Sequence, residues 1–227
     1  MQITVNGGLL YALRTLNMKA GQYTSVLEEV ANSVTHGVGL LFSIIGATLL
    51  LINATKSENF WKVLGVSIFV ITIILTYTFS TLYHGLYFTK AKKVFQVLDH
   101  SSIFLLILGT YSGFILAVLK NNSGLIVLTI VWLVTILGIV YKSIFMEKFK
   151  MLQVITYVFL GWMAIFITPS LLATLGSPII ILLLTGGLFY TLGLIFFAWK
   201  KLKFNHTIWH VFVLMGSIYH FLALYLL

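Results

Sequence analysis

The chain has 227 residues, of which 60% are hydrophobic and only 8% are charged. Soluble domains carry roughly a quarter charged residues, so this composition excludes an ordinary water-soluble protein. Although the net charge is +9, the basic residues form no long tract that would follow a phosphate backbone, and we expect no nucleic-acid partner. The absence of cysteine excludes disulfides and thiolate metal ligands. The sequence predicts a multi-pass protein of the cell membrane.

Charged residues divide the chain into apolar runs long enough to cross a bilayer, which takes about 20 residues per helix. The runs are too long and too uniformly apolar for barrel strands. No charged residue occurs from Met151 to Trp199, a stretch too long for one span, and Pro169 and Gly176-Ser177-Pro178 predict a turn near its middle. We therefore expect an all-α integral membrane protein with seven transmembrane helices. They are placed at 34–53, 63–88, 98–119, 121–141, 151–168, 178–199 and 204–227.

The basic residues that flank the spans predict the orientation of the chain, because cytoplasmic loops carry an excess of Lys and Arg. With the N-terminus cytoplasmic and the C-terminus outside, only Lys56, Lys62 and Lys120 of the fourteen basic residues lie on the outer side. The first residues show no pattern of a cleaved signal peptide. The expected organisation is an N-terminal cytoplasmic segment over residues 1–30 and a seven-helix transmembrane domain over residues 31–227.

All six histidines fall inside predicted spans, where polar groups are costly and by default indicate a site, and three of them lie at one depth. His84 ends the second span, and His206 and His210 begin the seventh. Counted from the nearest cytoplasmic lysine, each lies within about 5–11 Å of the predicted boundary. His206 and His210 are four residues apart and share a helix face. Since three imidazoles that leave one position open are the ligand set of a catalytic zinc, the sequence predicts a Zn²⁺ site.

Two further polar residues lie at the same predicted depth. Asp99 begins the third span and is the carboxylate placed to orient a water molecule and accept its proton. Ser80 lies one turn before His84, where its hydroxyl can donate to that water or to a developing oxyanion. The predicted catalytic residues are therefore Asp99 and Ser80. Taken singly, each histidine also fits a second interpretation, a helix-end anchor or a hydrogen bond between helices.

The other histidines fit other roles. His100 is rotated by about 100° from Asp99 on a helix and cannot share its face. His220 lies roughly 15 Å deeper than His210 and off its face, so we expect it to hydrogen-bond a neighbouring helix.

The residues around His36 leave two interpretations open. Glu28 and Glu29 precede it on the cytoplasmic side. This group fits a second shell that orients the metal ligands. It also fits the N-terminal cap of the first helix, which accounts for Asn32 and Ser33 as well.

Four motifs resemble the signatures of the haemolysin III proteins, which belong to the progestin and adipoQ receptor family. They are EEVANSVTHG over residues 28–37, Ser80-x-x-x-His84, Leu98-Asp99-His100-Ser101 and His206-x-x-x-His210. The resemblance covers the chain from about residue 28 to its end and indicates a bacterial member. It implies seven helices, a cytoplasmic N-terminus and a zinc ion near the cytoplasmic face. The implied zinc ligands are the same three histidines, with Asp99 and Ser80 alongside.

The related adiponectin receptors and alkaline ceramidases are similar in this site, which implies hydrolysis of a lipid amide. Membrane lipids and a lipid-like substrate are then the expected partners. Two alternatives stay open, a pore-forming cytolytic protein and a lipid-sensing receptor, each with a structural zinc. The oligomeric state also stays open, because Gly186-Gly187 and Gly109-x-x-x-Gly113 allow close helix packing within or between chains.

Overall fold

The computed structural model describes residues 20–145, 148 and 150–227. Within this part of the chain, seven helical spans are long and apolar enough to cross a membrane. The predicted all-α membrane protein with seven spans is confirmed. Arg14 and Lys19, which contribute to the expected cytoplasmic charge, lie outside the described residues, as does most of the expected N-terminal segment. The spans are Ser25–Lys56, Phe60–Gly85, Lys92–Val118, Asn122–Ile144, Met151–Leu175, Ser177–Ala198 and Asn205–Tyr225.

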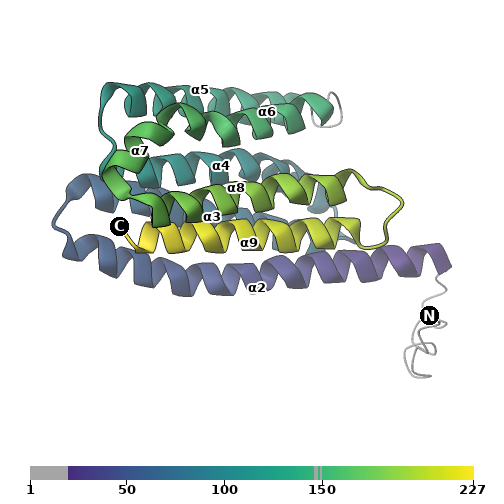
Figure 1. Ribbon diagram of the computed structural model, residues 1–227. Helices are drawn as coiled ribbons and strands as arrows, with labels where there is room; N and C mark the ends of the chain where they lie inside the picture. The colour runs from purple at the N-terminus through teal and green to yellow at the C-terminus, as the bar shows by residue number, and fades with distance from the viewer. Residues whose placement is uncertain (1–19, 146–147, 149) are drawn as a thin grey trace.

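The helices run side by side in one bundle (Figure 1). Along the chain, α2 packs against α3, α3 against α4, and α4 against α5, while α8 packs against α9. The last helix also returns to the first, because α9 contacts α2. Residues from opposite ends of the sequence therefore share one side of the bundle. The long helices are α2 (Ala20–Lys56), α3 (Phe60–Gly85), α4 (Lys92–Val118), α5 (Asn122–Ile144), α6 (Lys150–Trp162), α8 (Ser177–Ala198) and α9 (Asn205–Tyr225).

The fifth span is not one α-helix. After α6 the chain continues as a 3₁₀ turn, η1 (Met163–Ile167), and a short helix, α7 (Thr168–Leu175). The sequence ends this span at residue 168 because of Pro169, whereas the structure places that proline in the first turn of α7. A proline is accommodated there, since the missing N–H has no partner within the helix. The chain turns instead at Gly176, whose φ of 74° is the left-handed conformation that glycine adopts without strain.

Buried apolar side chains form two clusters. The first joins α2, α3 and α9 with part of α4, and it includes Leu50, Phe69 and Val213. The second joins α4, α5 and the α6–α7 span and includes Val131 and Leu160. Large apolar side chains also cover much of the outer surface, as expected of helices that face lipid rather than water. The first cluster matters most for function, because α2, α3 and α9 carry the residues described next.

Candidate metal centre

Three histidines from distant parts of the chain meet at one end of the bundle. His84 lies at the end of α3, and His206 and His210 lie at the start of α9. One potential ligand atom from each lies within 4.8 Å of the other two. The ring centroids are 4.6 Å apart for His206 and His210, and 5.1 and 5.0 Å from His84 to these two rings. This spacing fits three ligands of a single metal ion.

The start of α9 is fixed by α2, which places His206 and His210. The backbone N–H of Phe204 donates to the Glu28 carboxylate at 3.1 Å. Phe204 has a left-handed φ of 57° and comes directly before the first residue of α9. Within the first turn of α9, the Thr207 hydroxyl donates to the Asn32 side-chain oxygen at 2.5 Å. These contacts join residues more than 170 positions apart and set the register of α9 against α2.

Two of the three rings are oriented by acceptors on α2. The His84 Nδ1 lies 2.5 Å from the Glu29 carboxylate, which also accepts from the Lys92 ammonium at 2.9 Å. The His210 Nδ1 lies 3.2 Å from the backbone oxygen of Asn32. Since a carboxylate and a carbonyl only accept, each Nδ1 carries the hydrogen, and in a neutral ring the Nε2 then keeps its lone pair. Metal-binding histidines show this same arrangement, with the second ring N–H donated to a carboxylate or carbonyl.

The free ring nitrogen of His84 supports the fit to a metal. Within the described part of the chain, this Nε2 is buried and has no hydrogen-bond partner. The great majority of buried polar atoms in proteins have a hydrogen-bond partner. A cation held by the three imidazoles would supply what this nitrogen lacks. The chemistry of the donor set therefore fits Zn²⁺, which prefers imidazole nitrogen in tetrahedral sites.

Of the two interpretations left open for this group, the one in which Asn32 and Ser33 cap the first helix is wrong. Helix α2 begins at Ala20, so both residues lie in its interior. The helix tolerates the preceding acidic pair because each carboxylate has a partner, Phe204 for Glu28 and the His84 ring for Glu29. The contact between Glu29 and His84 leaves the second-shell interpretation of this group standing.

His36 lies directly beside the three-histidine cluster without belonging to it. Its ring stacks on His210, with centroids 3.6 Å apart and planes 9° apart. Its other neighbour is Tyr77, which meets it edge-on at 5.1 Å. His36 is buried, and neither of its ring nitrogens has a hydrogen-bond partner in the described residues. Its stacking restricts the rotation of the His210 ring.

The two predicted catalytic residues occupy different surroundings. Ser80 is buried one turn before His84, and its hydroxyl has no hydrogen-bond partner among the described residues. Asp99 is half-buried on α4 and lies outside the group of three potential ligands. Its carboxylate interacts electrostatically with Tyr157 of α6. The carboxylate in contact with a candidate ligand is instead Glu29, at the His84 ring.

The remaining histidines contact backbone oxygens. The His220 Nε2 lies 3.2 Å from the oxygen of Leu183 on α8, which confirms the predicted hydrogen bond to a neighbouring helix. The His100 Nδ1 lies 2.6 Å from the oxygen of Gln96 on its own helix.

The fold and the surface composition define a multi-pass protein of the bacterial cell membrane, with a buried three-histidine cluster near one end of its bundle. The model of the haemolysin-III-related family matches residues 24–221. The chain belongs to this family, as the four sequence motifs indicate.

Named relatives support the assignment. The chain is 42% identical over 192 residues to Hemolysin-3 of Bacillus cereus, covering 85% of this chain and 88% of the relative. It is 40% identical over 193 residues to the Hemolysin-3 homolog of Bacillus subtilis (strain 168), covering 85% and 91%. A more distant match is the human Monocyte to macrophage differentiation factor, 26% identical over 226 residues and covering 93% and 91%. No solved structure gives a significant match.

Proposed function

We propose that this protein is a zinc-dependent hydrolase that cleaves an amide or ester bond of a membrane lipid. The observation that carries the proposal is the convergence of His84, His206 and His210 within 4.8 Å in a membrane-spanning bundle. Polar side chains at this depth are costly and need a function to retain them. Three histidine ligands leave a fourth position open, which is typical of catalytic zinc sites, whereas structural sites use four protein ligands.

The residues that would bind the ion, and those that orient their rings, are assigned from their contacts. His84, His206 and His210 hold the ion, while Glu29 and the Asn32 carbonyl keep two of the rings in place. When bound, zinc polarises a carbonyl oxygen and increases the acidity of a water molecule.

In this proposal Asp99 transfers the protons, and Ser80 stabilises the oxyanion by a hydrogen bond. Asp99 accepts the proton of the attacking water and passes it to the leaving amine or alcohol. Its partial exposure allows proton exchange with solvent. Ser80 donates its hydroxyl hydrogen to the substrate carbonyl oxygen as negative charge develops there. That hydroxyl is available because it has no hydrogen-bond partner among the described residues.

The proposed orientation places the cluster on the cytoplasmic side. The turn after α3 and the turn before α9 lie next to His84 and His206, and both are rich in lysine. Cytoplasmic loops carry an excess of basic residues. In this proposal the lysine-rich end therefore faces the cytoplasm, and the C-terminus lies outside. Water and protons then reach the site from the cytoplasm, and lipid enters from the bilayer. The lysines are Lys90, Lys92, Lys93, Lys200, Lys201 and Lys203.

A second candidate function comes from the bacterial relatives, whose names refer to haemolysis. In that case the histidine cluster holds a structural zinc that joins α3 to α9 in a cytolytic protein. A lipid-sensing receptor with a structural zinc is the third candidate. Lysis of red cells that survives loss of the metal would separate the cytolytic function from hydrolysis.

The proposal is tested by metal analysis of the purified protein together with hydrolysis of a fluorescent ceramide. We expect about one zinc per chain and measurable release of fatty acid. The Asp99→Asn variant should keep the metal and lose at least about 100-fold in hydrolysis rate, because general-base catalysis typically contributes that much. Loss of the metal in this variant would make Asp99 a ligand rather than the base. Stoichiometric metal without turnover of any lipid amide or ester would favour a structural zinc.

A further inference from the structure

Two basic turns lie at the end of the bundle that carries the histidine cluster. The α3–α4 turn follows His84, and the α8–α9 turn precedes His206. In each turn, three lysines occur within four consecutive positions. They are Lys90, Lys92 and Lys93 in the α3–α4 turn, and Lys200, Lys201 and Lys203 in the α8–α9 turn.

Helix α2 joins the two basic turns. The Lys92 ammonium of the α3–α4 turn donates to the Glu29 carboxylate at 2.9 Å. At the end of the α8–α9 turn, the backbone N–H of Phe204 donates to the Glu28 carboxylate at 3.1 Å. Because Glu28 and Glu29 are consecutive residues, both basic turns contact the same turn of α2. The same contacts occupy both carboxylates.

Four of the six lysines keep their ammonium groups free for another partner. Lys90, Lys93, Lys201 and Lys203 are exposed and form no ion pair with any residue that the structure describes. A group of like charges without counter-charges produces a positive potential that attracts anions. The two turns together therefore form a positively charged surface next to the candidate metal centre.

Large apolar side chains are exposed in and beside the same turns. Phe88 is 75% exposed, Val94 is 61% exposed and Trp199 is 54% exposed. Aromatic side chains such as tryptophan are enriched where the hydrocarbon of a bilayer meets the headgroups. The neighbouring lysines therefore lie at the level of the headgroups. This surface fits a ligand that offers negative charge and acyl chains together.

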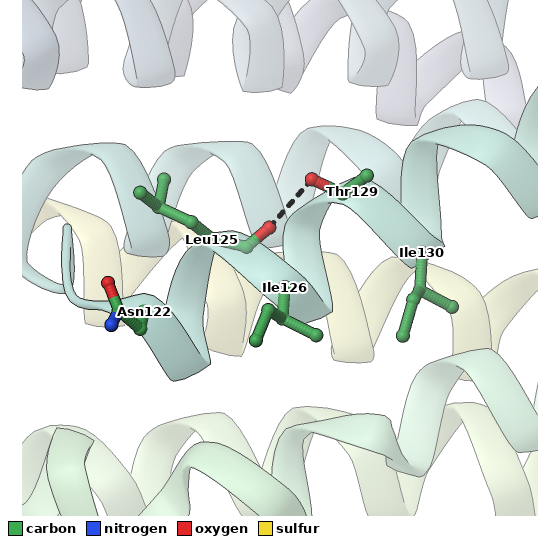
Figure 2. Close-up of a pocket in the computed structure, with 5 residues that line it drawn as sticks. All are labelled: Asn122, Leu125, Ile126, Thr129 and Ile130. Carbon is green, nitrogen blue, oxygen red and sulfur yellow. Dashed lines mark hydrogen bonds between the residues drawn. The ribbon is translucent and has the colours of Figure 1, made fainter.

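A hollow on α5 lacks this combination of charge and apolar surface. It measures about 400 Å³, and its lining residues come from one helix and are uncharged (Figure 2). The Thr129 hydroxyl donates to the backbone oxygen of Leu125, so the helix itself satisfies this polar group. The lining residues are Asn122, Leu125, Ile126, Thr129 and Ile130.

The lysines at the opposite end of the bundle also differ from the two basic turns. Lys62 is buried, and its ammonium donates to the Asn53 side chain at 3.3 Å. The Lys120 ammonium lies 5.3 Å from the centre of an aromatic ring. Lys56 is exposed, but the acidic Glu58 lies in the same turn. Free positive charge is therefore concentrated at the histidine end of the bundle.

We propose that the two basic turns form one binding surface for the headgroups of anionic phospholipids. The lipid phosphates bind the four exposed lysines, and the acyl chains lie beside Phe88 and Trp199. Clusters of about four to eight basic residues directly beside a membrane span are typical of anionic-lipid binding. The inference goes beyond the proposed function, since it requires neither a metal ion nor hydrolysis.

Lipid binding is measured on the full-length protein in nanodiscs of equimolar phosphatidylcholine and phosphatidylglycerol. Native mass spectrometry after release from the nanodisc counts the lipids of each class that the protein retains. We expect phosphatidylglycerol to be retained at least about fivefold over phosphatidylcholine, because several lysines attract each headgroup. Lys90→Gln/Lys93→Gln and Lys201→Gln/Lys203→Gln should each reduce this preference at least about twofold. An unchanged preference in either double variant would overturn the proposal of one shared surface.

The matched control is Lys56→Gln/Lys120→Gln, which removes the same charge from exposed side chains at the opposite end of the bundle. It should retain the wild-type preference for phosphatidylglycerol. An equal fall in the control and in the turn variants would show a general effect of net charge and would overturn the assignment to the basic turns.

A further comparison separates lipid binding from the binding of a free anion. Phosphatidylserine, an anionic lipid with a different headgroup, should be retained as strongly as phosphatidylglycerol. Inorganic phosphate should release no more lipid than sodium chloride of equal ionic strength, and greater release by phosphate would indicate a site for a free anion instead. Lipid retention needs no turnover, so failure of the proposed hydrolase would appear separately, as missing zinc or missing hydrolysis.

Discussion

Two buried polar clusters in this bundle differ in whether all their polar atoms have hydrogen-bond partners. In the first, His84, His206 and His210 converge, and the His84 Nε2 has no partner within the described residues. In the second, the Tyr77 hydroxyl donates to Ser217 at 2.8 Å, and the Tyr190 hydroxyl lies 2.9 Å from the same serine oxygen. The tyrosine–serine cluster joins α3, α8 and α9 and satisfies its hydroxyls internally.

The difference separates a structural network from a candidate site. A buried polar network that satisfies all its members stabilises a unique packing. A cluster in which a buried ring nitrogen such as the His84 Nε2 lacks a partner keeps a desolvation penalty that a bound ion would relieve. Both clusters are polar and both draw residues from α3 and α9, so composition alone does not distinguish them. Variants in each cluster should therefore differ in metal content first and in stability second.

The largest effect is expected from removal of a metal ligand. His210→Ala should reduce zinc from about one ion per chain to less than about a tenth after dialysis, because two imidazoles do not hold zinc as three do. Metal content is measured by mass spectrometry of the purified protein. His220→Ala is the control, since His220 lies on the same helix and its ring contacts the backbone oxygen of Leu183 on α8. Equal zinc content in His210→Ala and the wild type would show that the three-histidine cluster is not the zinc site.

A smaller effect is expected from the residue that orients His84. Glu29→Gln keeps the shape of the side chain but removes the charge that accepts from the His84 Nδ1–H. Loss of such an outer partner typically lowers metal affinity by about 10- to 100-fold, and competition with a chelator of known affinity measures it.

The control for Glu29→Gln is Glu58→Gln, because Glu58 is exposed in the turn at the opposite end of the bundle. It should leave zinc affinity unchanged. If both variants bind zinc as the wild type does, the contact between Glu29 and His84 has no part in holding the ion.

The sequence predicts the spans and the three histidines well because both follow from the cost of polar groups in lipid. Charges separate the apolar runs, and the distance of each histidine from the nearest lysine gives its depth. The role of Glu29 is harder to predict, since a carboxylate near the first span is also expected outside the membrane. Its partner His84 lies 55 positions away in the sequence, and no local sequence pattern predicts that contact. The spacing of Glu29, Asn32 and His36 on one helix face is the signal that identifies α2 as part of the site.

The neighbours of the Asp99 side chain are a second feature that the sequence does not give. Depth along a helix follows from counting residues, but the direction of a side chain depends on the rotation of that helix in the bundle. Asp99 has the predicted depth near the end of the bundle, and its carboxylate interacts with Tyr157 on α6. The rotation of α4 is set by its packing against α3 and α5, which the sequence alone does not give.

The smallest effect is expected in the tyrosine–serine cluster. Ser217→Ala removes the oxygen shared by Tyr77 and Tyr190. Hydrogen bonds between helices in membranes contribute about 0.6 kcal/mol on average, so the free energy of unfolding in a denaturing detergent titration should fall by about that amount. Zinc content should not change. Since His36 contacts both Tyr77 and His210, a loss of zinc in Ser217→Ala would instead show that the two clusters are coupled through the His36 ring.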